Sequence, residues 1–416
     1  MATGALPRSA LLVTPAVLAM QSAAENDLGK QRIQPQTASM TAGATSQPEG
    51  DRPSPGLADE AVEAPARQPR PQTVEIATLL GHRRNVVGVG LDPDGRLLAS
   101  ASSDGGVTLW DLAEPDHPAR TATLDLSRPR RRIAQCETAF SPDGRLLATG
   151  TTAGTVTLWD VTRPAHPTLA AALATGRSWF ITHRHAVAFS PDGSLLASAS
   201  SDGGVTLWDV SQPASPTLRA TLLDRYFNCM PVVSFSPDGR LLATSNRDQR
   251  TTIWDISDPA NPRETDTIDD RKRRQLSLVA GRFCPTGRLL AVSRYRETVA
   301  YTGDTGVIAD ADAEVTLWQV NRAGELTRIA QLKDSTLGDS ARNAKVTGMA
   351  FNRDGHLLAL GAAKGLQVWD VSDPICPIYT DRLRDRRGAG WVTLNPDGRL
   401  LASTSGKTVR LWRRTP

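Results

Sequence analysis

The sequence has few of the features on which covalent or metal-based folds depend. Its four cysteines are scattered and never occur as a Cys-x-x-Cys pair, so neither a disulfide framework nor a zinc ribbon is expected. Strictly apolar runs are short, such as Leu11 to Val13, whereas a helix that spans a bilayer needs about 20 apolar residues. The sequence therefore excludes a polytopic membrane protein.

Common catalytic and metal-binding motifs are missing as well. The chain has no glycine-rich phosphate loop and no Gly-x-Ser-x-Gly elbow. His183 and His185 lack carboxylate or cysteine companions, which is more typical of ordinary loop sequence than of a metal site. Asp310, Asp312 and Glu314 lack the spacing and the glycine of a calcium-binding loop. We therefore expect no enzyme, no metal and no cofactor.

The chain does contain enough apolar residues for a core. Hydrophobic residues make up 39% of the 416 residues, and the 33 glycines bring this share to about 47%, which is ordinary for a soluble globular protein. Six of the 48 basic residues are lysines, so 42 are arginines, a ratio that fits a GC-rich genome. The position of the arginines is therefore more informative than their number.

Composition changes at about residue 72. Residues 1–72 are rich in Ala, Pro, Gln, Ser and Thr and contain no Phe, Tyr or Trp, so they predict a flexible tail. Arg8 and the mildly apolar stretch from Ala10 to Met20 outline a secretory signal, but Thr14 and Pro15 interrupt it. We expect a cytoplasmic protein, with export as the alternative.

One unit recurs seven times in residues 73–416, and its spacing predicts the fold. Each copy has a glycine at the end of a Pro-Asp-Gly-like turn, and a tryptophan follows 15 residues later in the first four copies. The distance is 31 in the fifth copy and 14 in the last two. The glycines are Gly95, Gly144, Gly193, Gly239, Gly287, Gly355 and Gly398.

Each copy reads as four antiparallel strands. Pro-Asp-Gly suits a type I turn, which joins a strand at Val86 to Leu91 to another at Arg96 to Ala101. The β-branched and aromatic stretch Val107 to Trp110 is the third strand, and a proline-punctuated loop leads to the fourth at Arg120 to Leu124. A sheet that is apolar on both faces must stack on neighbours, and closing the stack into a ring buries every face.

The chain resembles the WD-repeat (WD40) β-propeller family. The resemblance is carried by Phe-Ser-Pro-Asp-Gly at 140–144, 189–193 and 235–239, and by Leu-Trp-Asp at 109–111, 158–160 and 207–209. The proline-rich connectors are most similar to bacterial members. The resemblance implies an all-β, seven-bladed propeller of four-stranded antiparallel blades that acts as a scaffold for protein binding.

Two features of the copies lead to further expectations. The last copy ends at Trp412 without a fourth strand, so we expect residues 73–80 to form the outer strand of the last blade and close the ring. The family's Gly-His pair occurs only as Gly81-His82. The hydrogen-bonded set that the resemblance implies is therefore complete only in the first copy, as His82, Ser100, Asp104 and Trp110. We expect the tryptophans that end the other six copies to be structural: Trp159, Trp208, Trp254, Trp318, Trp369 and Trp412.

The resemblance also assigns seven loop windows to one rim: 81–85, 125–133, 174–185, 223–230, 269–276, 333–345 and 384–390. They contain 19 Lys and Arg against 7 Asp and Glu. Basic residues with exposed aromatics predict a partner-binding rim for an acidic or phosphate-bearing protein segment. Its candidate residues are Arg83, Arg84, Arg130, Arg131, Arg132, Trp179, Phe180, Tyr226, Phe227, Arg273, Arg274, Arg386 and Arg387.

Other interpretations stay open. The same basic rim suits unspecific binding of nucleic acid. A lactonase-like propeller enzyme is disfavoured because an acid and histidine cluster is missing. We expect a monomer. The fifth copy contains about 16 extra residues, roughly Arg294 to Asp310. They predict either an acidic loop that competes with the acidic partner for the rim or an extended hairpin.

Overall fold

The computed structural model describes residues 72–125, 135–151, 155–174, 185–200, 204–223, 232–245, 250–269, 276–302, 305–332, 346–362, 365–385 and 388–415. The chain divides into two units, Met1–Ala66 and Arg67–Pro416, and every described residue lies in the second unit. The expected tail, residues 1–72, lies outside the described residues except for Gln72.

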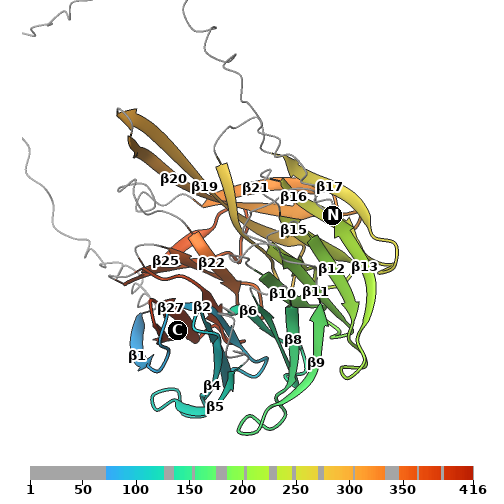
Figure 1. Ribbon diagram of the computed structural model, residues 1–416. Coiled ribbons are helices and arrows are strands. Elements are labelled where there is room, and N and C mark those ends of the chain that lie inside the picture. Colours follow the sequence, from blue (N-terminus) through green and yellow to red (C-terminus); the bar gives the residue numbers. More distant parts are fainter. Residues whose placement is uncertain are drawn as a thin grey trace, which may run out of the picture. The chain divides into compact units, whose positions relative to one another are not determined.

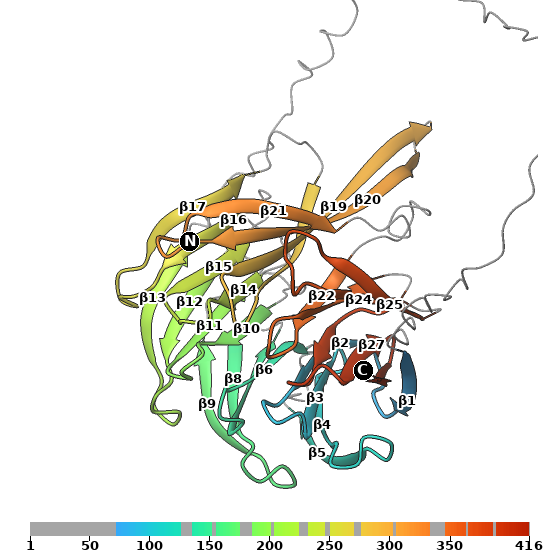
Figure 2. The ribbon, with the colours of Figure 1, turned by 180° about the vertical axis from the view of Figure 1, so that it is seen from behind.

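The second unit is all-β and has seven blades of four antiparallel strands arranged in a ring (Figures 1 and 2). The bounds of the strands, blade by blade and from the inner strand outward, are as follows. Blade 1 is β2 (Val86–Leu91), β3 (Leu97–Ser102), β4 (Gly106–Asp111) and β5 (Ala119–Asp125); blade 2 is β6 (Gln135–Phe140), β7 (Leu146–Thr151), β8 (Thr155–Asp160) and β9 (Thr168–Ala174). Blade 3 is β10 (His185–Phe189), β11 (Leu195–Ser200), β12 (Gly204–Asp209) and β13 (Thr217–Leu223); blade 4 is β14 (Val232–Phe235), β15 (Leu241–Ser245), β16 (Arg250–Asp255) and β17 (Arg263–Asp269). Blade 5 is β18 (Leu276–Phe283), β19 (Leu289–Thr302), β20 (Thr305–Val320) and β21 (Leu326–Leu332); blade 6 is β22 (Val346–Phe351), β23 (Leu357–Ala362), β24 (Gly365–Asp370) and β25 (Ile378–Arg384). Blade 7 is β26 (Val392–Leu394), β27 (Leu400–Ser405), β28 (Thr408–Arg414) and β1 (Thr73–Leu79).

The repeated turn explains why each blade begins in the same way. In blade 1 the Gly95 N–H donates to the Asp92 carbonyl at 3.0 Å, and Gly95 has a φ of 71°, which favours glycine. The turns of successive blades also touch, since a Cβ at Gly144 would lie 3.4 Å from Cδ of Pro93. The Pro-Asp-Gly sequence therefore serves both the turn and its contact with the next blade.

The hydrophobic core lies between blades. One cluster joins Leu98 and Trp110 of blade 1 to Val409 and Leu411 of blade 7, and all four side chains are buried. Such clusters repeat around the ring, so each blade is stabilised by its two neighbours rather than by a core of its own.

The N-terminal strand closes the ring, as the sequence predicted. β1 pairs antiparallel with β28, with Glu75 opposite Trp412 and Leu79 opposite Val409. Arg410 strengthens this closure because its guanidinium lies 3.3 Å from the Glu75 carboxylate and 3.5 Å from that of buried Asp385 in blade 6.

The extra residues of blade 5 form an extended hairpin. β19 and β20 pair from Leu289 opposite Gln319 to Thr302 opposite Thr305, and both views show the hairpin reaching past the neighbouring strands (Figures 1 and 2). Of the two interpretations of this segment, the extended hairpin therefore agrees with its backbone structure.

Candidate functional site

The predicted rim is described only in part. Arg83 and Arg84 lie between β1 and β2, and both side chains are exposed. The Arg83 N–H donates to Asp104 Oδ2 at 2.8 Å, and the Arg84 carbonyl accepts from the Ser102 hydroxyl at 3.2 Å. Their backbones are thus fixed while their guanidinium groups face solvent. The other candidates lie outside the described residues: Arg130, Arg131, Arg132, Trp179, Phe180, Tyr226, Phe227, Arg273, Arg274, Arg386 and Arg387.

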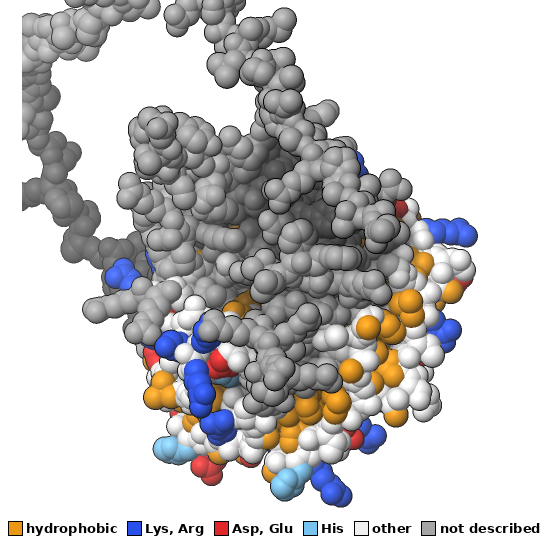
Figure 3. Space-filling model, viewed as in Figure 1, with side chains coloured by type: hydrophobic (Ala, Val, Ile, Leu, Met, Phe, Trp, Pro, Cys, Tyr) orange, Lys and Arg blue, Asp and Glu red, His pale blue; other side chains and the backbone are white. Residues whose placement is uncertain are grey.

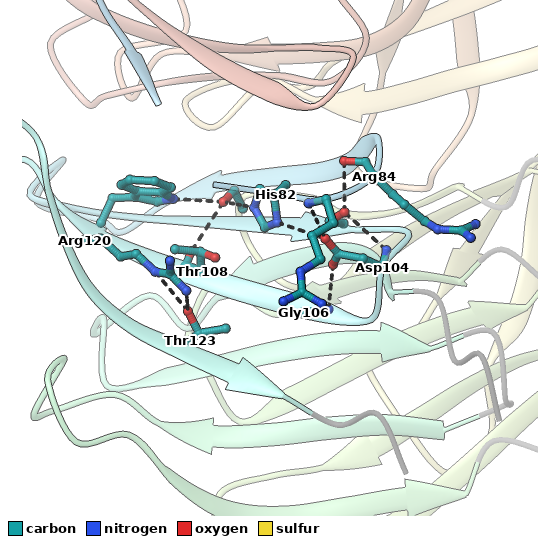
Figure 4. A network of polar contacts seen from close by, with 11 residues as sticks. His82, Arg84, Asp104, Gly106, Thr108, Arg120 and Thr123 are labelled. Atoms are coloured by element: carbon teal, nitrogen blue, oxygen red, sulfur yellow. Dashed lines mark hydrogen bonds and ion pairs between the residues drawn. The ribbon is translucent and has the colours of Figure 1, made fainter. Parts of the chain in front are cut away.

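The structure brings His82, Ser100, Asp104 and Trp110 together. Figure 4 shows His82 and Asp104 of this set beside Arg84. The Ser100 hydroxyl is fully buried; it lies 2.7 Å from His82 Nε2 and accepts the indole N–H of Trp110 at 2.9 Å. His82 Nδ1 lies 3.9 Å from Asp104 Oδ2, and Asp104 Oδ1 accepts the Gly106 N–H at 3.0 Å. The set ties the β1–β2 connection to the β3–β4 turn.

The pKa values of this set favour a neutral histidine beside an ionised aspartate. Burial lowers the pKa of His82, and the attraction of Asp104 only partly offsets this. Burial alone would raise the pKa of Asp104, but the Gly106 and Arg83 N–H groups, His82 and Ser102 together hold it below its usual value. The set is therefore an arrangement of hydrogen bonds rather than a strong ion pair.

The repeat tryptophans of the other six blades also donate their indole N–H groups inside their blades. Trp254 and Trp412 donate to hydroxyls on the second strand, those of Thr244 and Ser403, each at 2.9 Å. In the remaining blades the acceptor stands two residues before the tryptophan: Thr157 at 3.2 Å, Thr206 at 3.1 Å, Thr316 at 2.8 Å and Gln367 at 3.4 Å. For Trp159, Trp208 and Trp318, this acceptor is the threonine of the sequence Val-Thr-Leu-Trp. It could therefore be identified from the sequence.

A charged pair across the ring axis was missed by the sequence analysis. Glu137 on β6 of blade 2 and Arg282 on β18 of blade 5 approach to 3.9 Å between Oε1 and Nη2. These two blades are three apart in a ring of seven, so the contact crosses the axis. Among the seven inner strands, only Glu137 and Arg282 carry a formal charge. A charged residue in an inner strand of mostly small or apolar residues was the signal from which the sequence could have identified this pair.

The Glu137 carboxyl is unusually basic. Burial raises its pKa to about 7, while Arg282 and the Val187 N–H lower it only in part. The Arg282 side chain keeps 36% of its surface exposed, and water therefore screens a contact that is already long. This carboxyl consequently changes charge near neutral pH.

The described residues contain no cluster of three or more His, Cys, Asp or Glu side chains that could hold a metal ion. His185 begins β10, whereas His183 lies outside the described residues. In the parts of the chain that the structure describes, no helix is long and apolar enough to cross a membrane.

Comparison with protein families found the WD domain, G-beta repeat at residues 73–111, 133–160, 177–209, 229–255 and 388–413. The LVIVD repeat matches residues 247–270, which contain the two outer strands of blade 4. No curated protein matched the chain. Proteins with WD40 propellers are typically scaffolds for protein binding. With five matched repeats and seven blades, this chain is a WD40-repeat β-propeller.

Proposed function

We propose that this propeller is a non-catalytic scaffold that binds an acidic or phosphorylated protein segment on one basic rim. We define the basic rim as the seven connections from the outer strand of one blade to the inner strand of the next. The β1–β2 connection, from blade 7 to blade 1, is one of them. The observation that carries the proposal is the excess of 19 Lys and Arg over 7 Asp and Glu in the seven windows given above. Exposed Arg83 and Arg84 are its described representatives.

The opposite face has a different charge pattern, which supports the proposal. There, arginines have carboxylates beside them: Arg413 Nη2 lies 2.9 Å from Asp116, and Arg145 Nε lies 4.0 Å from Asp143. A GC-rich genome would enrich arginine on both faces alike. An excess of arginine over carboxylate residues in one set of connections therefore favours a role in binding.

Arginine and aromatic residues suit the proposed partner. A guanidinium group can hold a carboxylate or phosphate with two parallel N–H bonds. Trp179-Phe180 and Tyr226-Phe227 add the large side chains on which interface affinity often depends. Nucleic acid remains the competing ligand, because phosphate contacts alone need no particular base sequence.

The test compares two variants of the full chain with equal charge changes. The first replaces seven rim arginines by serine: Arg130, Arg131, Arg132, Arg273, Arg274, Arg386 and Arg387. The control replaces seven exposed arginines of the opposite face: Arg96, Arg145, Arg163, Arg240, Arg288, Arg353 and Arg399.

The probes are an acidic phosphoserine peptide, its unphosphorylated form and a DNA duplex, each titrated at two salt concentrations. The rim variant should lose peptide binding while the control retains it. Equal losses in both variants would overturn the proposal. Preference for the duplex over both peptides would favour the nucleic-acid alternative.

A further inference from the structure

The inner strands of the seven blades surround the ring axis and are poor in charge. Within β2, β6, β10, β14, β18, β22 and β26, Glu137 and Arg282 are the only residues with a formal charge. In the view of Figure 3, most of the described Lys and Arg side chains lie towards the edge of the molecule. Arg282 is therefore unusual in bringing a guanidinium group to the axis.

The Arg282 guanidinium has few partners within the protein. Its Nη2 lies 3.9 Å from Oε1 of Glu137, which is beyond hydrogen-bond distance, and it makes no hydrogen bond to any residue that the structure describes. A guanidinium group carries five N–H donors. The side chain is 36% exposed, so solutes in water reach it. Arg282 therefore has donors available for a ligand.

Glu137 is an incomplete counter-ion for Arg282. Its side chain is 13% exposed, and the carboxyl accepts the Val187 N–H. Because burial raises its pKa to about 7, the carboxyl is neutral at lower pH. The axis then carries the positive charge of Arg282 without an ionised carboxylate beside it. Charged groups inside proteins are normally paired, and an anion from solution supplies the missing partner.

Few other titratable groups lie near Glu137. The strands packed against β6 are β2, β3, β7 and β10, and the first three contain no titratable residue. β10 begins with His185, and β6 itself contains Cys136; neither side chain is among those that the structure describes. Across the axis, β18 contributes Arg282. Arg282 is therefore the charged group that faces the Glu137 carboxyl within the described residues.

We propose that Arg282 and Glu137 form a binding site for a small oxyanion at the ring axis. A carboxylate or phosphate group accepts two parallel N–H bonds from the Arg282 guanidinium. Glu137 takes up one proton from solution, which removes its repulsion of the anion and gives the carboxyl an O–H donor. Anion and proton therefore bind with positive linkage, so each raises the affinity of the site for the other.

This site is separate from the basic rim. The inner strands run from the rim towards the opposite face, and Arg282 is the second-last residue of β18. The next residues lead into the turn at Gly287 on the opposite face. The axis site therefore takes a small anion, whereas the proposed scaffold function concerns a protein segment on the rim. The variant that lacks seven rim arginines should retain the axis site, so the two proposals fail independently.

NMR titration of the full chain tests the proposal, with the Arg282 Nε–H and the Glu137 carboxyl as reporters. The probes are acetate and dimethyl phosphate, which stay singly charged from pH 6 to pH 8, and their relative affinities distinguish a carboxylate ligand from a phosphate ligand. Affinity should be about tenfold higher at pH 6 than at pH 8, since a pKa of about 7 lowers the protonated fraction from about 90% to about 10%. Saturating probe should raise the pKa of Glu137.

Three variants locate the site. Arg282→Gln should abolish the response of the Glu137 carboxyl to either probe. The matched control is Arg288→Gln, an exposed arginine in the following turn of the same blade, which should bind as the wild type does. Glu137→Gln should bind at both pH values with the affinity that the wild type has at pH 6. Thermal melting of each variant checks that it is folded.

Three results would each overturn the proposal. The first is an Arg282 signal that neither probe shifts. The second is a wild-type affinity that does not change between pH 6 and pH 8. The third is a pH dependence that persists in Glu137→Gln, because it would assign the proton to another group, such as His185.

Discussion

Asp104 in blade 1 and Glu137 at the ring axis are both largely buried carboxylates, and each lies 3.9 Å from a basic side chain. Their pKa values nevertheless move in opposite directions. The pKa of Asp104 falls below its usual value, whereas that of Glu137 rises to about 7. Proximity to a base therefore does not decide the charge of either group.

The difference lies in the hydrogen-bond donors around each carboxylate. Burial is the largest influence on both pKa values and raises both. Asp104 accepts two backbone N–H groups and contacts Ser102, and these donors replace the lost water. Glu137 has the Val187 N–H and a distant, partly exposed guanidinium. Local donors thus matter more than one long ion pair.

The largest expected effect comes from removing the charge at the axis. Glu137 binds a proton more tightly in the folded chain, with a pKa of about 7 against 4.5 in an unfolded chain. Its contribution to stability is therefore full below pH 4.5 and is lost as the pH rises through 7. Glu137→Gln should match the wild type at pH 4 and exceed its free energy of unfolding by up to ~3 kcal/mol at pH 8.

Denaturant unfolding at a series of pH values measures this difference. The matched control is Glu264→Gln on exposed β17, which should change the free energy of unfolding by less than ~0.5 kcal/mol. A Glu137→Gln protein that is less stable than the wild type at pH 8 would show that Arg282 compensates the burial of the charge.

A smaller effect of opposite sign is expected at Asp104. Asp104→Asn keeps one carbonyl oxygen for an N–H donor but removes the second acceptor and the charge. We expect a loss of ~1 kcal/mol in the free energy of unfolding at pH 7, since either the exposed Arg83 N–H or the partly buried Gly106 N–H is left without its acceptor. The folded pKa is depressed, so this loss should shrink as the pH falls below 3.8 towards that pKa.

Chemical denaturation at pH 7 and at pH 3 distinguishes this from a purely steric effect. Asp94→Asn in the exposed first turn of the same blade is the control and should change stability by less than ~0.5 kcal/mol. A loss that is the same at both pH values would contradict the assigned role of the carboxylate.

The repeat and its closure could be predicted from the sequence because their signals are local. Pro-Asp-Gly turns and the Gly-to-Trp spacing placed β2 at Val86–Leu91. The missing fourth strand after Trp412 and the spare strand at residues 73–80 predicted the pairing of β1 with β28. Each inference needed only the periodicity of one blade.

The axis pair could not be predicted in the same way. Glu137 and Arg282 are far apart in sequence and belong to blades that share no strand pairing, so only the closed ring brings them together. The basic rim was predicted from connections of variable length, where the turn chemistry that defines the strands is absent. Of its candidate residues, Arg83 and Arg84 alone lie within the described parts of the chain.

The smallest expected effect separates the two influences on Glu137. Arg282→Gln removes the guanidinium but leaves burial and the Val187 N–H in place, so the pKa of Glu137 should rise above about 7. At pH 5 the folded chain holds Glu137 protonated, and the substitution should cost little stability. At pH 8 it should cost ~1 kcal/mol or less, because the pair is long and Arg282 is partly exposed.

NMR titration of the Glu137 carboxyl measures the pKa directly. The same substitution in a Glu137→Gln background should lose its pH dependence, and a cost that persists there would assign Arg282 to packing rather than to the charge of Glu137.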